Sequence, residues 1–369
     1  MSSEARLSVV TSSASYEVVI ADGLLGQAGE RVRQVSNAAR CALVTDDNVY
    51  SRFAAAVSPS LRAAGIEAVE IVVPQGEPSK SWERAGEVLE QMAAARLERS
   101  DLVVALGGGV IGDLAGFCAA VYLRGVGYVQ LPTTLLAQVD SSVGGKTGVD
   151  LRAGKNLAGA FKQPLLVLAD TSSLGMLPDE EWISGLAEVA KAAMLTGPAQ
   201  VEWMIRSAGA LAHREPEAVR EAVLAAVRHK IGVVSADEHE TGLRESLNYG
   251  HTLGHAIERV AGYGVVPHGV AVAEGMRFAA RLAGRVLGAS AEVASMQDDL
   301  LDGLGITRPS YPADAGALVD AMHADKKARG GTVRFALVPE PGRYVTVAVD
   351  DDVLLAEVRA WVEQSDERG

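Results

Sequence analysis

Cysteine is scarce in this sequence of 369 residues, which contains only Cys41 and Cys118. Two cysteines, each inside an apolar run, cannot form the disulfide framework of a small secreted domain. Buried thiols are typical of a reducing compartment, so we expect a cytoplasmic protein. The first residues, Met1 to Arg6, also lack the apolar core of a signal peptide.

Long apolar runs and an excess of positive charge are missing too. No run reaches the roughly 20 apolar residues that a membrane-spanning helix needs, so we expect no membrane partner. The net charge of -13 argues against nucleic acid or an anionic membrane surface as a partner. An anionic small molecule is not excluded, because a local basic pocket can lie in an acidic protein.

The first half of the chain alternates predicted strands with predicted helices, after two alternating stretches in residues 6–21 that predict a β-hairpin. The apolar strands are expected at residues 41–45, 68–73, 102–106, 128–131 and 165–168. Such a pattern predicts a parallel, Rossmann-like sheet, in which ligands bind beyond the carboxyl ends of the strands.

The second half has mainly helical periodicity, which begins near residues 170–178. We therefore predict an α/β nucleotide-binding domain over residues 1–174 and a mostly α-helical domain over residues 175–369. Near the end, β-like stretches at residues 333–338 and 344–349 precede a last amphipathic helix from about Asp351.

Histidine is concentrated in one short window, because 3 of the 7 histidines lie between His251 and His268. Together with Glu188 on a predicted helix, two imidazoles would form an open divalent-metal site that leaves a position for substrate. His251 and His255 are four residues apart and share a helical face. The spacing alone makes both of them candidate ligands, although a histidine can also be a buried core residue.

A glycine pattern, Gly107-x-Gly109-x-x-Gly112, follows a predicted strand and resembles a dinucleotide-binding turn. The pattern is weak by itself, since it is not in the first βαβ unit and no acidic residue follows about 20 positions later. A tight strand-to-helix turn would explain it equally well. Asp46, at the end of an earlier strand, could be the acidic partner of the ribose.

Residues 140–156 combine many glycines with Lys146 and Lys155, as in loops that cradle phosphate. The segment is not a Walker A motif, because Asp140 stands where that motif has its first glycine. A solvated loop with ordinary surface lysines is the alternative. Further cations at Lys230, Arg244 and 326–327 could receive carboxylate or phosphate, although a solvated helix face explains each of them singly.

These segments occur in the order typical of one family, at residues 76–80, 107–116, 122–125, 132–148, 154–156, 184–191, 244–258, 268–269 and 325–327. Across residues 46–335 the chain resembles 3-dehydroquinate synthases, a family of sugar phosphate cyclases. The resemblance implies an NAD-binding α/β domain, a helical metal-binding domain, an active site between them and a homodimer.

The resemblance also implies the residues of the site. It implies that Glu188, His251 and His268 hold a divalent metal, which is usually zinc and can be cobalt. It also implies that His255 faces the substrate. The implied NAD-binding residues are Asp46, Asn48, Glu77, Lys80, Gly108, Gly109, Val110, Asp113, Thr133, Thr134, Lys146, Lys155, Ser173 and Leu174. The implied catalytic residues are Asp140, Lys146, Lys191, Lys230, Arg244, Asn248 and His255. The implied substrate-binding residues are Asn156, Lys326, Lys327 and Arg124, the last of these lent across the dimer interface.

The implied substrate is 3-deoxy-arabino-heptulosonate 7-phosphate of the shikimate pathway. The family uses NAD to oxidise its C5 hydroxyl, eliminates phosphate, returns the hydride and closes the ring by an aldol step to give 3-dehydroquinate. It is thus a carbon–oxygen lyase. A carboxylate and a phosphate on one small sugar explain a cluster of cations in an acidic protein.

The sequence departs from the family pattern beside the third ligand, where Val270 replaces a usual glutamate and Glu274 stands four residues later. Glu274 could replace the carboxylate that supports a metal-bound histidine.

Another sugar phosphate cyclase is the alternative function, although such relatives usually change Lys230, Asn248 or residues 140–146. Metal-dependent alcohol and glycerol dehydrogenases are a second alternative, disfavoured because a neutral alcohol needs no anion clamp.

Overall fold

The protein is described here by a computed structural model that covers residues 4–311, 314–326 and 332–366. The chain forms two compact units. The first contains Met1–Leu177 and Lys230–Glu238, and the second contains Pro178–His229 and His239–Gly369. None of the described helices is long and apolar enough to span a lipid bilayer.

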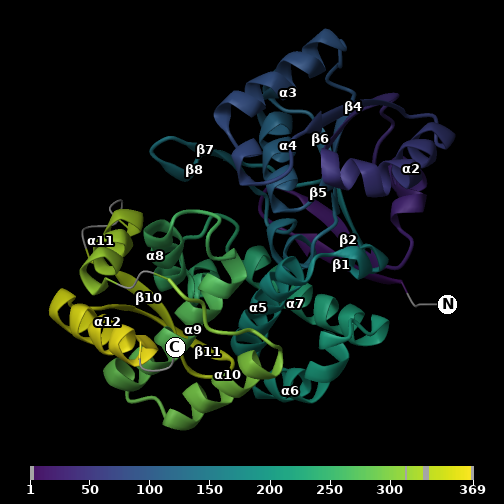
Figure 1. Ribbon diagram of the computed structural model, residues 1–369. Helices are drawn as coiled ribbons and strands as arrows, with labels where there is room; N and C mark the ends of the chain where they lie inside the picture. Colours follow the sequence, from purple (N-terminus) through teal and green to yellow (C-terminus); the bar gives the residue numbers. More distant parts are fainter. Residues whose placement is uncertain (1–3, 312–313, 327–331, 367–369) are drawn as a thin grey trace. The chain divides into compact units, whose positions relative to one another are not determined.

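The first unit is built on a seven-stranded sheet with the order β1-β2-β9-β6-β5-β3-β4 (Figure 1). Its strands are β1 (Ala5–Val10), β2 (Ser15–Ala21), β3 (Arg40–Asp46), β4 (Glu67–Val73), β5 (Leu102–Gly107), β6 (Gly127–Pro132) and β9 (Leu166–Asp170). β1 and β2 form the expected antiparallel hairpin, and the remaining pairs are parallel. The prediction of a mainly parallel α/β sheet is therefore confirmed.

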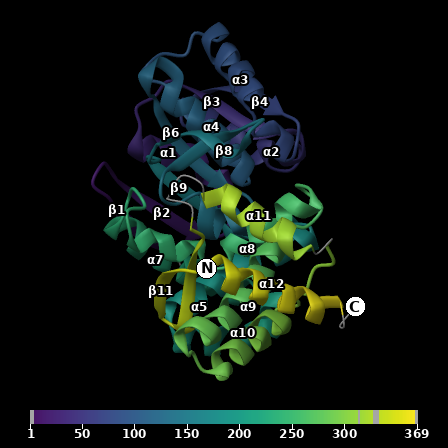
Figure 2. The same ribbon diagram turned by 90° about the vertical axis from the view of Figure 1, so that its left-hand side faces the viewer.

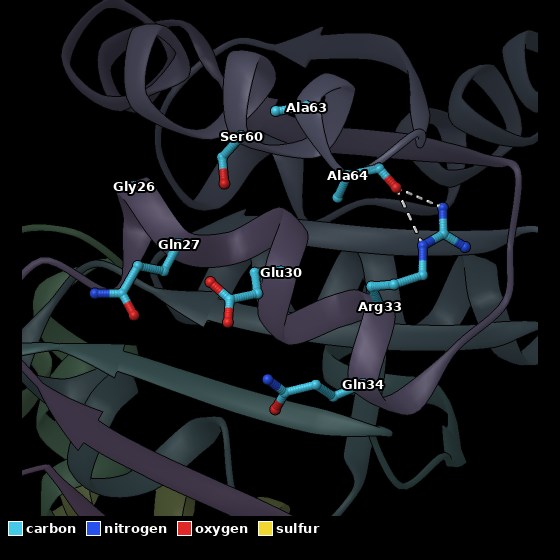
Figure 3. Close-up of a pocket in the computed structure, with 8 residues that line it drawn as sticks. All are labelled: Gly26, Gln27, Glu30, Arg33, Gln34, Ser60, Ala63 and Ala64. Atoms are coloured by element: carbon cyan, nitrogen blue, oxygen red, sulfur yellow. Dashed lines mark hydrogen bonds between the residues drawn. The ribbon is translucent and has the colours of Figure 1, made fainter.

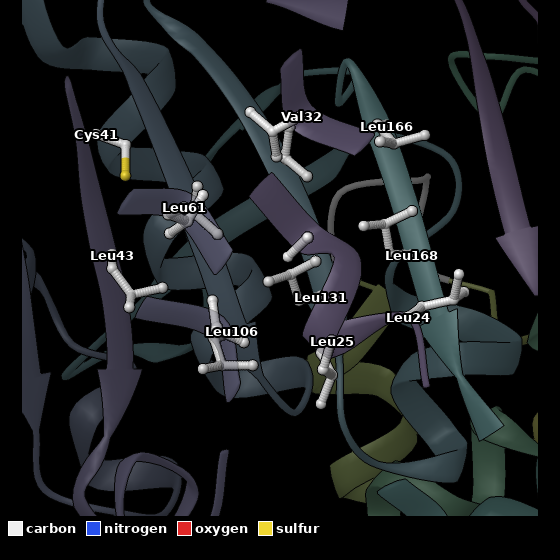
Figure 4. Close-up of a cluster of buried hydrophobic side chains, with 14 of the residues drawn as sticks. Leu24, Leu25, Val32, Cys41, Leu43, Leu61, Leu106, Leu131, Leu166 and Leu168 are labelled. Carbon is white, nitrogen blue, oxygen red and sulfur yellow. The ribbon is translucent and has the colours of Figure 1, made fainter. Parts of the chain in front are cut away.

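Four helices cover the sheet, namely α1 (Ala28–Val35), α2 (Asp47–Ala63), α3 (Trp82–Ala94) and α4 (Gly109–Val121). Side chains of β5 alternate between two apolar clusters, because successive residues of a strand point to opposite faces. Leu102, Val104 and Leu106 join the cluster with Val32 of α1 and Leu61 of α2, part of which Figure 4 shows. The intervening residues of β5 join a second cluster, which α3 and α4 complete. A central strand buried on both faces explains the continuous apolar run in the sequence.

The glycine-rich segment predicted as a phosphate-binding loop instead forms an antiparallel pair, β7 (Lys146–Leu151) and β8 (Gly154–Phe161). Glycine is rare in strands, so the composition favoured a loop. Here the glycines permit a close backbone approach. A Cβ on Gly148 would lie 2.9 Å from the oxygen of Ala158, and one on Gly159 would lie 2.6 Å from the oxygen of Thr147.

The second unit is mainly helical, as the periodicity predicted. Its helices are α5 (Asp179–Thr196), α6 (Pro198–Ala212), the first part of α7 (Pro216–Ala236), α8 (His251–Ala261), α9 (His268–Leu287), α10 (Ala291–Gly303), α11 (Ala315–Lys326) and α12 (Asp351–Asp366). The β-like stretches near the end form a hairpin of β10 (Arg334–Glu340) and β11 (Arg343–Ala348). α11 packs against α8 and α12 (Figure 2).

Glycines let α5, α8 and α9 approach at backbone distance. A Cβ on Gly269 in α9 would lie 2.0 Å from the oxygen of Ser184 in α5, and the Ser184 hydroxyl accepts a hydrogen bond from Gly269 N at 3.0 Å. A Cβ on Gly275 would lie 1.9 Å from the oxygen of Gly250, which precedes α8. Only residues without a side chain fit at these crossings.

We expect Gly269→Ala to lower the free energy of unfolding by about 1–3 kcal/mol, the usual cost of overpacking. Chemical denaturation would measure it. Gly209→Ala on α6 is the control, because a Cβ there meets nothing within 4 Å. The control should keep or slightly raise stability, since alanine is the better helix former. Equal stability of Gly269→Ala and the unmodified protein would contradict the close contact.

Candidate functional site

Three helices of the second unit bring one carboxylate and two imidazoles together. α5 carries Glu188, α8 begins with His251, and α9 begins with His268. One possible ligand atom of each residue lies within 4.8 Å of the others. Zinc binds nitrogen and oxygen at about 2.0–2.2 Å, so side chains grouped on this scale can hold one ion.

The Glu188 carboxylate is the most constrained group of this cluster. The residue is 2% exposed, and neither oxygen accepts a well-formed hydrogen bond from the described residues. Lys191, one helical turn later, lies beside Oε2, and His251 Nε2 lies 3.7 Å from Oε1. A buried carboxylate is costly unless cations compensate it. A divalent ion held by this set would supply such compensation, so the donor atoms fit a metal.

His251 is in the protonation state that metal binding requires. Burial lowers its pKa well below the ordinary value, and Lys191 lowers it further. The neutral ring donates from Nδ1 to the Tyr249 carbonyl oxygen at 3.2 Å. Nε2 therefore keeps its lone pair on the side of Glu188, as a metal ligand does.

His268 is oriented by a carboxylate that the sequence did not single out. Its Nδ1 donates to Glu258 Oε2 at 3.1 Å. Burial alone would lower the pKa of His268, but Glu258 outweighs this effect and raises it. Glu274, considered above for this supporting role, instead lies 3.5 Å from Arg308. A signal for Glu258 was present, since it lies seven residues, or about two turns, after His251 on one helical face.

His255 completes a cluster of three imidazoles. Its ring centroid lies 5.3 Å from that of His251 and 6.0 Å from that of His268. It can also group with Glu258 and His268 within 4.8 Å. Because Glu258 already accepts from His268, the set with the buried Glu188 carboxylate is the better donor set for a single ion.

The second unit also carries other residues that were predicted to be catalytic or to bind substrate. Lys191 and Arg244 are both 3% exposed. Asn248 donates from Nδ2 to Glu240 Oε1 at 3.0 Å in the 3-10 segment η6 (Leu243–Asn248). Lys326 ends α11 but its side chain is not described, and Lys327 lies outside the described residues.

In the first unit, the glycine pattern makes a sharp turn from β5 into α4. β5 ends at Gly107, Gly108 caps the helix, and Gly109 and Val110 begin it. A Cβ on Gly107 would lie 2.7 Å from Ile111, and the N–H groups of this first turn have no intrahelical partner. Such a helix start attracts an anionic group such as a pyrophosphate.

Charged residues predicted to bind the cofactor pair with one another near this turn. Lys80, which is 6% exposed, donates to Asp113 at 2.6 Å. Burial alone would lower the pKa of Lys80, but Asp113 outweighs it and raises the pKa. Lys155 forms a second ion pair, with its Nζ 3.5 Å from Glu77 Oε1. The four side chains thus form two ion pairs.

The remaining cofactor candidates differ in what their side chains do. Asp46 Oδ1 caps α2 by accepting from Val49 N at 2.8 Å, and burial raises the pKa of this carboxyl. Asn48 Oδ1 accepts from Arg52 Nε at 3.1 Å. The buried Thr133 hydroxyl has no partner among the described residues, which suits a ligand contact.

Three further cofactor candidates are occupied within the fold. Thr134 Oγ1 accepts from Ala137 N at 3.1 Å. The buried Ser173 hydroxyl donates to the Asp170 carbonyl at 2.7 Å, and Leu174 is 1% exposed.

The first unit carries several residues that were predicted to contact the substrate, and they lie on different elements. Lys230 belongs to this unit and not to the helical one. Its Nζ donates to the Asp140 carbonyl at 2.6 Å and to the Asp140 carboxylate. Lys146 is exposed at the start of β7. Asn156 and Arg124 are exposed with φ angles of 56° and 68°, a conformation uncommon outside glycine.

A surface groove of about 590 Å³ lies between α1 and α2 (Figure 3). None of the predicted site residues lines it. Arg33 in its wall donates from Nε and Nη2 to the Ala64 carbonyl at 3.1 and 2.9 Å. This arginine therefore caps the end of α2, and no residue of the turn between β5 and α4 lines the groove.

Sequence comparison matches both halves of the chain to one enzyme. The N-terminal family of 3-dehydroquinate synthase matches residues 70–184, and the C-terminal family matches residues 185–328. The 3-dehydroquinate synthase of Paracoccus denitrificans is 45% identical over 347 residues, covering 92% of this chain and 94% of that protein. That of Caulobacter vibrioides is 46% identical over 352 residues, covering 93% and 95%.

Structure comparison finds the same fold in related cyclases. A 2-epi-5-epi-valiolone synthase from Streptomyces hygroscopicus, with NAD+ and Zn2+ bound, has a TM-score of 0.87 and 27% identity, covering 99% of this chain and 100% of that chain. A 2-deoxy-scyllo-inosose synthase complexed with carbaglucose-6-phosphate, NAD+ and Co2+ has a TM-score of 0.89 at 23% identity, covering 96% and 100%. An iron-containing alcohol dehydrogenase has a TM-score of 0.67 at 16% identity, covering 94% and 96%, and shares the fold alone.

Removing single histidines separates the two possible ligand sets. His268→Ala should abolish stoichiometric zinc binding, because it removes one of the two imidazoles that complete the ligand set with Glu188. His255→Ala should retain zinc. Metal analysis after dialysis would measure both variants, with His323→Ala on α11 as the control, since His323 pairs with Asp351 at 3.0 Å. Retention of zinc by His268→Ala together with its loss from His255→Ala would contradict the assignment.

Proposed function

Because the chain belongs to the 3-dehydroquinate synthase family, we propose that it converts 3-deoxy-arabino-heptulosonate 7-phosphate into 3-dehydroquinate and phosphate. The observation that carries this proposal is the match of both family halves, with relatives aligned over more than 90% of either length. The buried Glu188 carboxylate beside two imidazoles supports it. The reaction class is that of a carbon–oxygen lyase.

The cofactors are proposed on the same basis. NAD, which would accept a hydride from the substrate and return it within one turnover, would bind at the start of α4 in the first unit. A divalent metal, zinc or cobalt, would be held by Glu188, His251 and His268 and would make the substrate hydroxyl easier to deprotonate. Cyclases of this fold have been solved with NAD+ and Zn2+ or Co2+.

The chain's own residues prepare this chemistry. Glu258 fixes the ring of His268 through Nδ1, and the Tyr249 carbonyl fixes that of His251, so that each Nε2 is presented as a ligand. Lys191 lies beside the buried Glu188 carboxylate and places a positive charge next to it. His255 would face the substrate from α8, the helix that also carries His251.

Cations would bind the two anionic groups of the substrate. Arg244 is buried in the second unit, and Lys230 lies beside Asp140 in the first. Lys146 and Arg124 are exposed. Charge-assisted bonds from such groups are the strongest that a carboxylate or a phosphate receives from a protein. A neutral alcohol would leave these charges without use, which favours a sugar phosphate over the dehydrogenase substrates.

We also propose a homodimer in a reducing cytoplasm. Both cysteines are buried and reduced, and burial raises the pKa of each thiol to about 12. Exposed apolar side chains lie at and after the end of α4, where Val121 is 43% exposed and Leu123 39%. Trp82 of α3, which is 57% exposed, contacts Phe117 of α4 with ring centroids 6.1 Å apart. Arg124 follows Leu123 directly, so a second copy covering this apolar surface would receive the arginine.

A charge placed in this surface should dissociate the dimer. Val121→Glu is expected to give a monomer in sedimentation velocity, because a buried unpaired carboxylate disfavours the interface. Val10→Glu on β1, where the side chain is 59% exposed, is the control and should leave the assembly unchanged. A dimer that is equally stable with Val121→Glu would rule out this surface.

The proposed reaction uses NAD as a catalyst and not as a reagent. In one cuvette with sugar phosphate, zinc and NAD, we expect phosphate release in proportion to substrate consumed, while NADH absorbance stays flat. Many turnovers per NAD should occur. Stoichiometric NADH without phosphate would contradict the synthase and indicate a dehydrogenase. Glucose 6-phosphate or sedoheptulose 7-phosphate as the preferred substrate would indicate another cyclase.

A further inference from the structure

The last part of α7 belongs to the first unit although the rest of the helix does not. The chain enters this unit at Lys230 and leaves it after Glu238. Lys230 connects the beginning of the segment to Asp140, because its Nζ donates to the carbonyl and the carboxylate of that residue. Lys230 is 7% exposed, so its side chain lies among protein groups and not in solvent.

Glu238 forms the hydrogen bonds that hold the other end of the segment. Its carboxylate accepts from Ser12 Oγ at 2.5 Å, from Ser13 N at 3.1 Å and from Gln163 Nε2 at 2.8 Å, and the Ser13 hydroxyl donates to it as well. Ser12 and Ser13 form the turn between β1 and β2. Burial alone would raise the pKa of Glu238, but these hydrogen bonds outweigh it and lower the pKa to about 2. The carboxylate is therefore charged throughout the neutral range.

The same carboxylate is connected to the turn that carries Lys146. Gln163, which donates to Glu238, lies against Gly145, where a Cβ would meet its side-chain amide at 2.7 Å. The adjacent Lys162 N donates to the Gly145 carbonyl at 2.7 Å. On the other side, Gly144 N donates to the Tyr16 hydroxyl at 3.2 Å. Gly145 has a φ of +70°, so its close contact with Gln163 and its backbone both exclude a side chain.

We propose that Glu238 is a positioning residue for the reaction, which sets the places of Lys230 and Lys146 through the end of α7 and through Gln163. The inference rests on the proposed function, since both lysines are assigned to the substrate there. Glu238 connects three segments that are distant in the sequence, namely the turn after β1, the end of β8 and the end of α7. Displacing one end of this network moves both cations.

Glu238→Gln tests the proposal, because the amide keeps the shape but presents an N–H group to donors and loses the charge. We expect kcat for phosphate release to fall by about tenfold or more, since small misplacements of catalytic groups have effects of this order. Glu70→Gln is the matched control, because Glu70 also accepts two hydroxyl hydrogen bonds, from Tyr50 at 2.7 Å and Ser58 at 2.6 Å, in the same unit. The control should retain full kcat.

A double-mutant cycle with Lys230→Met distinguishes positioning from simple stabilisation. If Glu238 acts through Lys230, the two losses in kcat will be clearly less than multiplicative. Multiplicative losses, or a lower unfolding temperature with unchanged kcat, would overturn the proposal. If Glu238→Gln does not fold, Gln163→Ala replaces it, since the serine hydrogen bonds remain, and unchanged kcat in that variant would overturn the proposal equally. Absence of phosphate release by the unmodified enzyme would instead contradict the proposed function.

Discussion

The buried carboxylate of Glu188 is the constraint on which the second unit depends. Burying a carboxylate to 2% exposure is costly unless positive charge or a metal compensates it, and the fold places Lys191 beside Oε2 and two imidazoles within 4.8 Å of the carboxylate. This arrangement requires three helices at backbone distance, which explains Gly269 at the crossing with α5. The close packing of these helices therefore also brings the three candidate metal ligands together.

The first unit would bind the proposed anionic cofactor through backbone N–H groups and cations. The turn after β5 supplies the N–H groups. Lys80 is already paired with Asp113, whereas Lys230 is held by Asp140 and the segment that ends at Glu238. Ion pairs formed before the ligand arrives keep these cations ordered, so that binding costs less conformational entropy.

Much of the site could be predicted from particular residues. Helical spacing alone left both His251 and His255 as candidate ligands, and the resemblance to the family implied the set of Glu188, His251 and His268, which the structure gathers. The supporting carboxylate could not be predicted with the same success, because Glu258 and Glu274 are both compatible with helical spacing. Their roles differ only through tertiary packing, which turns Glu258 toward His268 and Glu274 toward Arg308. Spacing along one helix cannot indicate what lies opposite on another.

The sequence by itself determined the α/β pattern, the helical second half, the family and the residue types of the metal site, because periodicity and motif spacing are local properties. Tertiary structure alone decided three matters. It paired the glycine-rich segment as β7 and β8, it assigned Lys230 to the first unit, and it gathered Ser12, Ser13 and Gln163 around Glu238. Each depends on contacts between residues far apart in the chain, and such contacts leave no periodic signal in the sequence.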